Sequence, residues 1–192
     1  MKLNSLKIKR MVGLASLASI VVVLQLFSNY VQFGPVAITL ALIPIVVGAI
    51  IYGPKGGLTL GLIHGAIVCT APTTIALFMP ITVFGTIVVC LLKSGIAGLV
   101  SGYVFNLLKK NHLVAVIAAS VVVPLVNTGL FTIASFTIFT PLITGFANDM
   151  GLNVAKYFFL YFIGYNFLIE FFVNSALSPV VIRIVDLYKL KK

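Results

Sequence analysis

Residues 113–138, LVAVIAASVVVPLVNTGLFTIASFTI, form a run of sequence that contains no charged side chain. A helix needs about 20 mainly apolar residues to cross the hydrocarbon core of a bilayer, and this run is long enough. Similar runs recur along the chain of 192 residues, of which 61% are hydrophobic and 8% are charged. A soluble domain could not build a polar surface from this composition. The sequence therefore predicts an integral membrane protein, and we expect residues 1–192 to form a single membrane domain.

Turn signals divide the chain into six predicted membrane helices. Clusters of glycine, proline, lysine or asparagine break the apolar runs at 33–35, 52–56, 71–80, 109–111 and 145–156. The predicted helices are 11–31, 36–52, 57–76, 84–108, 113–138 and 157–184. The expected fold class is therefore an all-α membrane protein with six transmembrane helices. The first helix is too long for the apolar region of a typical signal peptide, so we expect it to be retained.

The net charge of +10 could indicate a nucleic-acid partner, so its distribution along the chain matters. An even number of spans places both termini on one side of the membrane. Of the 13 Lys and Arg residues, all except Lys93 and Lys156 fall on that side. Membrane proteins concentrate Lys and Arg in their cytoplasmic loops. The pattern therefore predicts cytoplasmic termini, and it favours a lipid bilayer rather than nucleic acid as the surroundings of this chain.

Small residues at helical spacing indicate where helices approach closely. The third predicted helix carries Gly57, Gly61 and Gly65 at four-residue steps, and the fourth carries Gly98 and Gly102. We expect these glycines to form packing interfaces inside the bundle.

Polar residues of the predicted helices gather at one depth. We measure depth from the Lys, Arg or His residue at the inner end of each helix, with a rise of about 1.5 Å per residue. On this scale Lys93, Asn127 and Asn166 lie roughly 24, 22 and 26 Å above the inner boundary. Gln25 and Thr39 fall at roughly 22 to 24 Å. Polar groups at such depth normally face the bundle interior or a water-filled cavity, so the sequence predicts a pocket open toward the outside.

Lys93 is the strongest candidate for ligand contact, because an ammonium in hydrocarbon needs an anionic partner. Gln25 and Thr39 could instead bond only to neighbouring backbone or helices. Glu170, one turn deeper than Asn166, could pair with Lys93, be protonated and hydrogen-bonded, or accept a donor group of a ligand.

Two further polar residues are expected to be structural. Asn174 lies one turn deeper than Glu170. His64 lies only about 14 Å from the inner side, on the glycine-rich third helix. A histidine in such a place is more often a satisfied interior residue than a ligand contact.

Residues needed for several other functions are absent. There is no GxxxxGK[ST] loop for ATP, no HExxH motif and no Cys and His cluster that could hold a metal. The three acidic residues form no close pair for acid–base catalysis. Cys69 and Cys90 have no CxxC spacing and are interpreted as small packing residues. We therefore expect no enzyme activity, no cofactor and no metal. A stand-alone secondary transporter stays open, although no inverted repeat supports it.

Four segments in order resemble one family of membrane proteins. They are IYGPKGG at 51–57, KSGIAGLVSG at 93–102, VNTGLF at 126–131 and NFLIE at 166–170. With the order of the apolar runs, they are similar to substrate-binding S components of energy-coupling-factor (ECF) vitamin transporters. The resemblance implies six helices, a vitamin pocket near the extracellular side and no ATPase of its own. It also implies a bacterial plasma membrane, a membrane-embedded coupling protein and two cytoplasmic ATPase subunits as partners.

The resemblance also suggests how the partner is contacted. In this family the loaded S component is thought to topple in the membrane, and an AxxxA pattern on helix 1 contacts the coupling protein. Ala15 and Ser19 are the nearest match here, with serine in place of the second alanine. This departure should not block close packing.

The sequence is most similar to pantothenate-type members. A buried Lys93 suits a small ligand with one carboxylate, and the amides of Asn127 and Asn166 suit hydroxyl and amide groups. Folate, pyridoxine and hydroxymethylpyrimidine stay open as alternative substrates. The candidate substrate-binding residues are Lys93, Asn127, Asn166, Glu170, Gln25 and Thr74.

Overall fold

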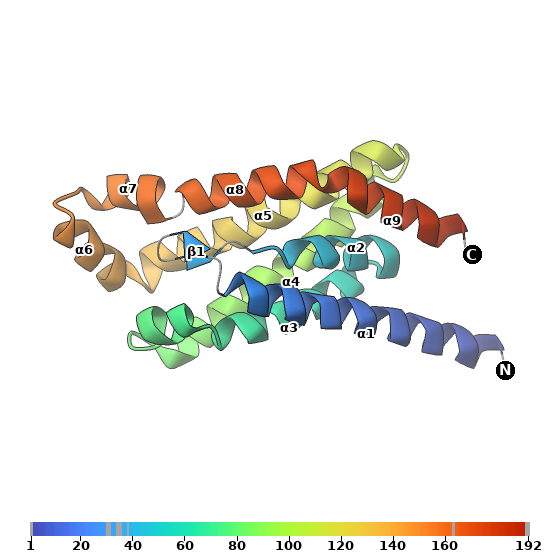
Figure 1. Cartoon of the computed structure of the whole chain (residues 1–192), viewed down its shortest axis with the longest axis horizontal. Helices are drawn as coiled ribbons and strands as arrows, with labels where there is room; N and C mark the ends of the chain where they lie inside the picture. The colour runs from blue at the N-terminus through green and yellow to red at the C-terminus, as the bar shows by residue number, and fades with distance from the viewer. Residues whose placement is uncertain (1, 30–31, 34–35, 38, 163, 191–192) are drawn as a thin grey trace.

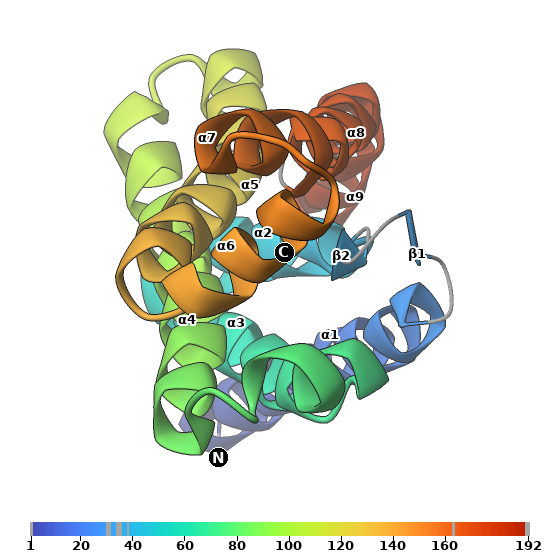
Figure 2. The ribbon, with the colours of Figure 1, turned by 90° about the vertical axis from the view of Figure 1, so that its left-hand side faces the viewer.

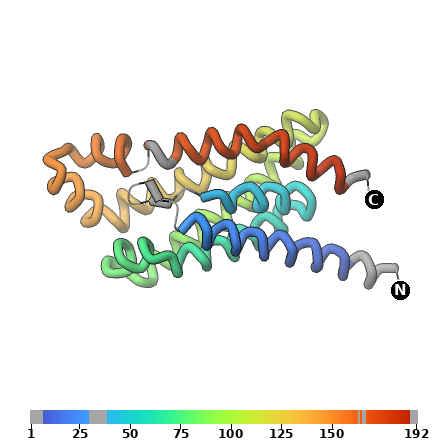
Figure 3. Tube along the Cα trace, viewed as in Figure 1, coloured from blue at the N-terminus to red at the C-terminus, as the bar shows by residue number. Residues whose placement is uncertain are grey.

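The computed structural model describes residues 2–29, 32–33, 36–37, 39–162 and 164–190. The long helices lie side by side along one axis of the molecule (Figure 1). Helix α1 (Lys2–Ser28) begins and helix α9 (Ser178–Leu190) ends at the same end of this bundle, as the Cα trace also shows (Figure 3). Within the described residues the fold is helical, as expected from the apolar runs, apart from two short strands that were not predicted.

Helix α3 (Pro54–Cys69) packs along α4 (Val83–Leu108) through glycine. A Cβ atom at Gly57 would collide with the backbone carbonyl of Gly98, and one at Gly61 would collide with that of Ser94. A Cβ atom at Gly65 would meet the carbonyl of Cys90 in the same way. The predicted glycine interface is therefore confirmed, and it brings the two helix backbones into direct contact.

Helix α2 (Leu42–Tyr52) is buried against this pair and against α5 (His112–Thr137). Gly53 joins α2 to α3 with a φ of 80°, which is the left-handed region that glycine tolerates. Pro54 then occupies the first turn of α3, where its missing N–H costs nothing. The predicted break at 52–56 is confirmed, as are the predicted helices 84–108 and 113–138 to within one residue.

The predicted helix 36–52 is wrong at its beginning. Val36–Ala37 forms strand β2, which pairs antiparallel with strand β1 (Gln32–Phe33), and the helix starts only at Leu42. Side chains of other helices bond the backbone N–H groups just before α2. Thr39 N donates to Glu170 Oε1 over 2.8 Å, and Leu40 N donates to Ser28 Oγ over 3.3 Å. These side chains satisfy N–H groups ahead of the helix, so the backbone there needs no helical partner.

The predicted helix 57–76 is also wrong at its end. Helix α3 stops at Cys69, because Pro72 cannot donate to a continuing helix. The hydroxyl of Thr70 bonds the carbonyl of Ile67 at this end over 2.8 Å. A single π-helical turn, η1 (Thr74–Phe78), follows and leads toward α4.

The last predicted helix, 157–184, is divided in the structure. Its range covers parts of four elements: α7 (Val154–Tyr157), the π-helical turn η2 (Phe158–Phe162), α8 (Gly164–Ala176) and α9. Pro179 lies in the first turn of α9, where it can begin a helix but could not continue α8. The predicted loop 145–156 is wrong in part, because α6 (Thr140–Asp149) covers 145–149 and α7 covers 154–156. Pro141 lies in the first turn of α6, where it can begin a helix.

Among the residues that the structure describes, four helices are long and apolar enough to cross a membrane: Lys7–Ser28, Val83–Leu108, His112–Thr137 and Val154–Ala176. Helix α2 is apolar but has 11 residues, and α3 has 16. At about 1.5 Å per residue, both are shorter than a core of about 30 Å. The predicted number of six spans is thus supported for four helices.

Basic residues gather at the end of the bundle where α1 begins and α9 ends. Arg10 Nη2 donates there to the carbonyl of Tyr52 at the end of α2, over 2.7 Å. His112 at the start of α5 pairs with Asp186 on α9, with 2.9 Å between Nε2 and Oδ1. An end-on view shows the helices around the bundle axis, with α6 and α7 across the opposite end (Figure 2).

Candidate functional site

A cavity lies inside the bundle, at the level where α1 ends. Its walls come from α1, the segment before α2, the end of α3, η1, α4, α5 and α8. About 80 Å³ is open to the centre of a water molecule, several times the roughly 10 to 15 Å³ that one water needs. Its polar and charged lining residues are Gln25, Asn29, Thr39, Thr73, Thr74, Thr86, Lys93, Asn127, Thr128 and Glu170. The cavity can therefore hold a small molecule with several polar groups.

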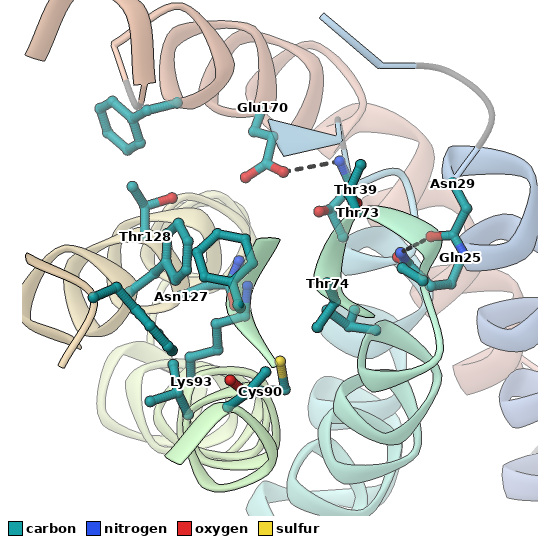
Figure 4. A pocket seen from close by; sticks show the side chains of 18 residues that line it. Gln25, Asn29, Thr39, Thr73, Thr74, Cys90, Lys93, Asn127, Thr128 and Glu170 are labelled. Carbon is teal, nitrogen blue, oxygen red and sulfur yellow. Dashed lines mark hydrogen bonds between the residues drawn. The ribbon is translucent and has the colours of Figure 1, made fainter. Parts of the chain in front are cut away.

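Five of the six candidate residues line this one cavity: Lys93, Asn127, Glu170, Gln25 and Thr74. The backbone of Asn166 lies in α8, and its side chain falls outside the part of the chain that the structure describes. Figure 4 shows Lys93, Asn127 and Thr128 on one side, Gln25, Asn29 and Thr74 on the opposite side, and Glu170 between the two. The depth measured along the sequence thus identified residues that share a cavity.

Lys93 reaches the cavity from the middle of α4. Its Nζ atom lies 4.6 Å from the centroid of the Phe131 ring, at a distance where the ring attracts a cation. Among the described residues the one ion pair joins His112 and Asp186, so Lys93 and Glu170 form none although both line the cavity. The ammonium thus lies over an aromatic face, and within the described part of the chain no carboxylate forms an ion pair with it.

Glu170 lies on α8, and its side chain is buried. Its Oε1 atom accepts the backbone N–H of Thr39 over 2.8 Å, which ties α8 to the segment before α2. Asn174, one turn further along α8, donates to the carbonyl of Glu170 over 2.8 Å. Among the described residues, Glu170 forms no ion pair with Lys93, and its carboxylate is instead hydrogen-bonded to the backbone of Thr39. The expectation that Asn174 is structural agrees with its bond to the helix backbone.

Asn127 projects from α5 into the cavity and is 4% exposed. Among the side chains that the structure describes, its Oδ1 atom is one of two buried oxygens without a hydrogen-bond partner. A buried acceptor of this kind costs free energy unless a donor meets it. Asn127 thus presents an acceptor that a donor on a ligand could satisfy.

Gln25, on the opposite side, belongs to a chain of hydrogen bonds. Its Nε2 atom donates to Asn29 Oδ1 over 2.9 Å, and its Oε1 atom lies 2.8 Å from Nε2 of His64. His64 Nδ1 lies 2.9 Å from Ser94 Oγ on α4. His64 is fully buried and does not line the cavity, which agrees with the expected interior histidine.

The sequence-based reasoning missed four prominent members of the cavity lining: Asn29, Thr73, Thr128 and Phe131. Asn29 follows Gln25 by one helical turn, and Thr128 is next to Asn127, so the spacing could have pointed to both. Phe131 follows Asn127 by one turn on the same face of α5. An aromatic residue in an apolar helix carries no polar signal, and the Lys93 contact becomes visible only in three dimensions.

The two candidate partner-contact residues, Ala15 and Ser19, are exposed on α1. The hydroxyl of Ser19 bonds the carbonyl of Ala15 over 3.1 Å, so it is satisfied within the helix. Large apolar side chains such as Met11, Val12 and Val23 are exposed on the same helix. This side of α1 is therefore available to lipid or to another membrane protein.

Among the described residues, no group of three His, Cys, Asp or Glu side chains could hold a metal ion. In comparisons with known proteins, a family model described as "ECF transporter, substrate-specific component" matches residues 9–182. No curated protein and no solved structure gave a match. The matched range contains every residue that lines the cavity.

Proposed function

Because the chain belongs to the family of substrate-specific components of ECF transporters, we propose that it is the vitamin-binding subunit of an importer, with pantothenate as its substrate. The observation that carries this proposal is the convergence of Lys93, Asn127, Gln25 and Glu170 on one cavity in an otherwise apolar bundle. Burial of polar and ionisable groups in a membrane protein is costly and marks substrate pathways. The cavity is accordingly the proposed vitamin site.

We further propose that the whole chain is one domain with six transmembrane segments in the cell membrane. In this arrangement α2 and α3 count as short spans packed inside the bundle. The chain ends face the cytoplasm, because Lys and Arg residues gather at that end of the bundle. The cavity then lies in the outer half of the membrane and receives its ligand from outside.

The polar groups of the cavity favour a small monocarboxylate. Lys93 offers an ammonium without an ion pair among the described residues, and a carboxylate would supply the missing charge. Asn127 offers an acceptor for a hydroxyl or amide N–H. Phe131, Phe139 and Phe167 supply apolar surface between these groups. Pantothenate carries one carboxylate, an amide, hydroxyl groups and a branched hydrocarbon centre, so its chemistry matches this set.

We propose that the exposed side of α1 around Ala15 and Ser19 docks onto the membrane-embedded coupling protein. Small side chains there would let two helices approach closely. Two cytoplasmic ATPase subunits would supply the energy, and toppling of the loaded subunit would deliver the vitamin.

A thermal-shift screen of the purified protein against B vitamins tests the proposal. A ligand that binds only the folded state stabilises it by about 2.7 kcal/mol at 100 times its Kd. We expect pantothenate to raise the melting temperature and panthenol, which has an alcohol in place of the carboxylate, to have a much weaker effect. A screen in which no vitamin binds below micromolar concentration would overturn the assignment as a vitamin-binding subunit.

The same screen contains folate, pyridoxine and hydroxymethylpyrimidine, and a shift with one of them would replace pantothenate without changing the class. A stand-alone secondary transporter predicts a different result. In that case pantothenate uptake would persist in cells that lack the coupling protein and ATPases, whereas the proposal predicts its loss.

A further inference from the structure

His64 connects three helices through two hydrogen bonds, although it lies behind the wall of the cavity. It projects from α3, and its ring lies 2.9 Å from Ser94 Oγ on α4 and 2.8 Å from Gln25 Oε1 on α1. All three side chains are 2% exposed or less. Gln25 lines the cavity, so one end of this chain of bonds reaches the proposed ligand site.

The acceptor groups give these bonds a direction. Gln25 Oε1 carries no hydrogen, so His64 must donate to it from Nε2. A neutral imidazole with a hydrogen on Nε2 has a lone pair on Nδ1, so the hydroxyl of Ser94 must donate to Nδ1. Gln25 Nε2 then donates to Asn29 Oδ1 over 2.9 Å (Figure 4). The donors thus follow one another in order, from Ser94 on α4 to His64 on α3 to Gln25 on α1, and the last bond lies at the cavity wall.

In this structure the amide oxygen of Gln25 faces His64 and the amide nitrogen faces Asn29. With a hydrogen on His64 Nε2, the flipped amide would set two N–H groups against each other. The terminal torsion of a glutamine side chain is broad and roughly two-fold, so the amide alone has little preference between two flipped orientations. The N–H of His64 selects the one in which oxygen points into the bundle and nitrogen points toward Asn29.

We propose that His64 is a positioning residue that fixes the Gln25 amide, so that Gln25 meets the ligand with the second N–H of its nitrogen rather than with its oxygen. The wall opposite, with the Asn127 oxygen, offers an acceptor. The ligand that fits has an acceptor atom on the α1 side, and on the opposite side it has a donor for Asn127 beside the carboxylate that meets Lys93. This inference rests on the proposed function of the cavity as a vitamin site.

Two substitutions of similar size test whether His64 acts by positioning Gln25 or only by filling space in the bundle. His64→Gln places an amide nitrogen near the former Nε2 and can still donate to Gln25, whereas His64→Asn can reach Ser94 but not Gln25. We expect His64→Asn to weaken pantothenate binding by about threefold to tenfold, the effect of losing one hydrogen bond. His64→Gln should stay within about twofold of the unchanged protein. Equal losses in both variants would indicate packing alone and would overturn the proposal.

Nuclear magnetic resonance of the ligand-free protein tests the same idea without any vitamin. The nitrogen signals of His64 should show Nε2 protonated and Nδ1 bare. The side-chain amide of Gln25 should give one sharp pair of proton signals in the unchanged protein and in His64→Gln, and a broadened pair in His64→Asn. A hydrogen on Nδ1, or identical Gln25 signals in all three proteins, would contradict the inference.

These two measurements also separate this inference from the proposed function. If pantothenate and the other vitamins fail to bind, the vitamin assignment fails while the Gln25 signals still decide the role of His64. If pantothenate binds but the Gln25 amide signals are the same in all three proteins, the proposed function stands and the positioning role of His64 is wrong.

Discussion

The two faces of α4 differ in what they contact. On one face, glycines press the α4 backbone directly against α3, and an added Cβ atom at Gly57 or Gly98 would meet the opposing carbonyl. On the other face, Lys93 and Thr86 border a cavity with space for a ligand. Close-packed backbone tolerates almost no added volume, whereas a ligand cavity leaves polar groups imperfectly satisfied. The tight face, which packs on α3 through Gly98, fixes the position of α4. The open face, which carries Lys93 and Thr86, therefore holds Lys93 at a defined place in the cavity wall.

The largest expected effect comes from adding volume to the tight face. In Gly57→Leu the new side chain would have to displace the backbone at Gly98, which cannot move without shifting α4. We expect a loss of about 3 kcal/mol in the free energy of unfolding, at the upper end of the usual range for overpacking. Thermal unfolding in detergent measures this loss.

Gly129→Leu is the matched control for this substitution. It makes the same change in α5, where a Cβ atom at Gly129 would meet nothing within 4 Å. Leucine favours a helix over glycine, so this variant should be unchanged or more stable by up to about 1 kcal/mol. A similar loss in both variants would mean that the α3–α4 contact is not specially tight.

The next effect acts on the open face and on binding rather than on stability. Lys93→Met removes the ammonium and keeps a long side chain against Phe131. We expect the affinity for pantothenate to fall by about 1.5 to 3 kcal/mol, the scale of a hydrogen bond to a charged group. Isothermal titration measures it, and Lys156→Met, which removes an exposed lysine outside the cavity, serves as the control. Unchanged affinity in Lys93→Met would remove this residue from the site.

The tight face was predictable from sequence for a physical reason. Glycines at four-residue steps lie on one face of a helix and predict close packing there, and both partner helices carried the pattern. The predicted helices 84–108 and 113–138 were likewise confirmed, because long apolar runs between clear caps leave few alternatives. Asn111 supplies such a cap, since its side chain accepts the N–H of Val114.

The open face was predictable only in part. Depth along a helix placed Lys93, Asn127 and Gln25 at one level, and all three line the same cavity. The elements that close the cavity were not predicted. The late start of α2 depends on tertiary bonds, such as that between Glu170 and Thr39, which join residues far apart in the chain. Local pattern contains no information about such partners.

A smaller effect is expected where the cavity wall meets the segment before α2. Glu170→Leu would leave the N–H of Thr39 without its acceptor, which should cost about 1 to 2 kcal/mol of stability. Glu170→Gln keeps an oxygen acceptor and should cost less than about 1 kcal/mol. Chemical denaturation of both variants measures the difference. Equal stabilities would show that this bond does not hold the segment in place.

Asn127 gives the smallest and most diagnostic effect, because the expected signs for stability and binding are opposite. Its buried oxygen has no partner in the ligand-free protein, and leucine has nearly the same shape without that acceptor. Asn127→Leu should therefore leave the free energy of unfolding unchanged or raise it by up to about 1 kcal/mol. Affinity for pantothenate should fall by about 0.5 to 1.5 kcal/mol, because the ligand donor loses its acceptor. Thermal unfolding and titration on one preparation measure both. A loss of stability would instead mean that the Asn127 side chain makes stabilising contacts within the bundle. The two faces of α4 would then differ less than the structure indicates.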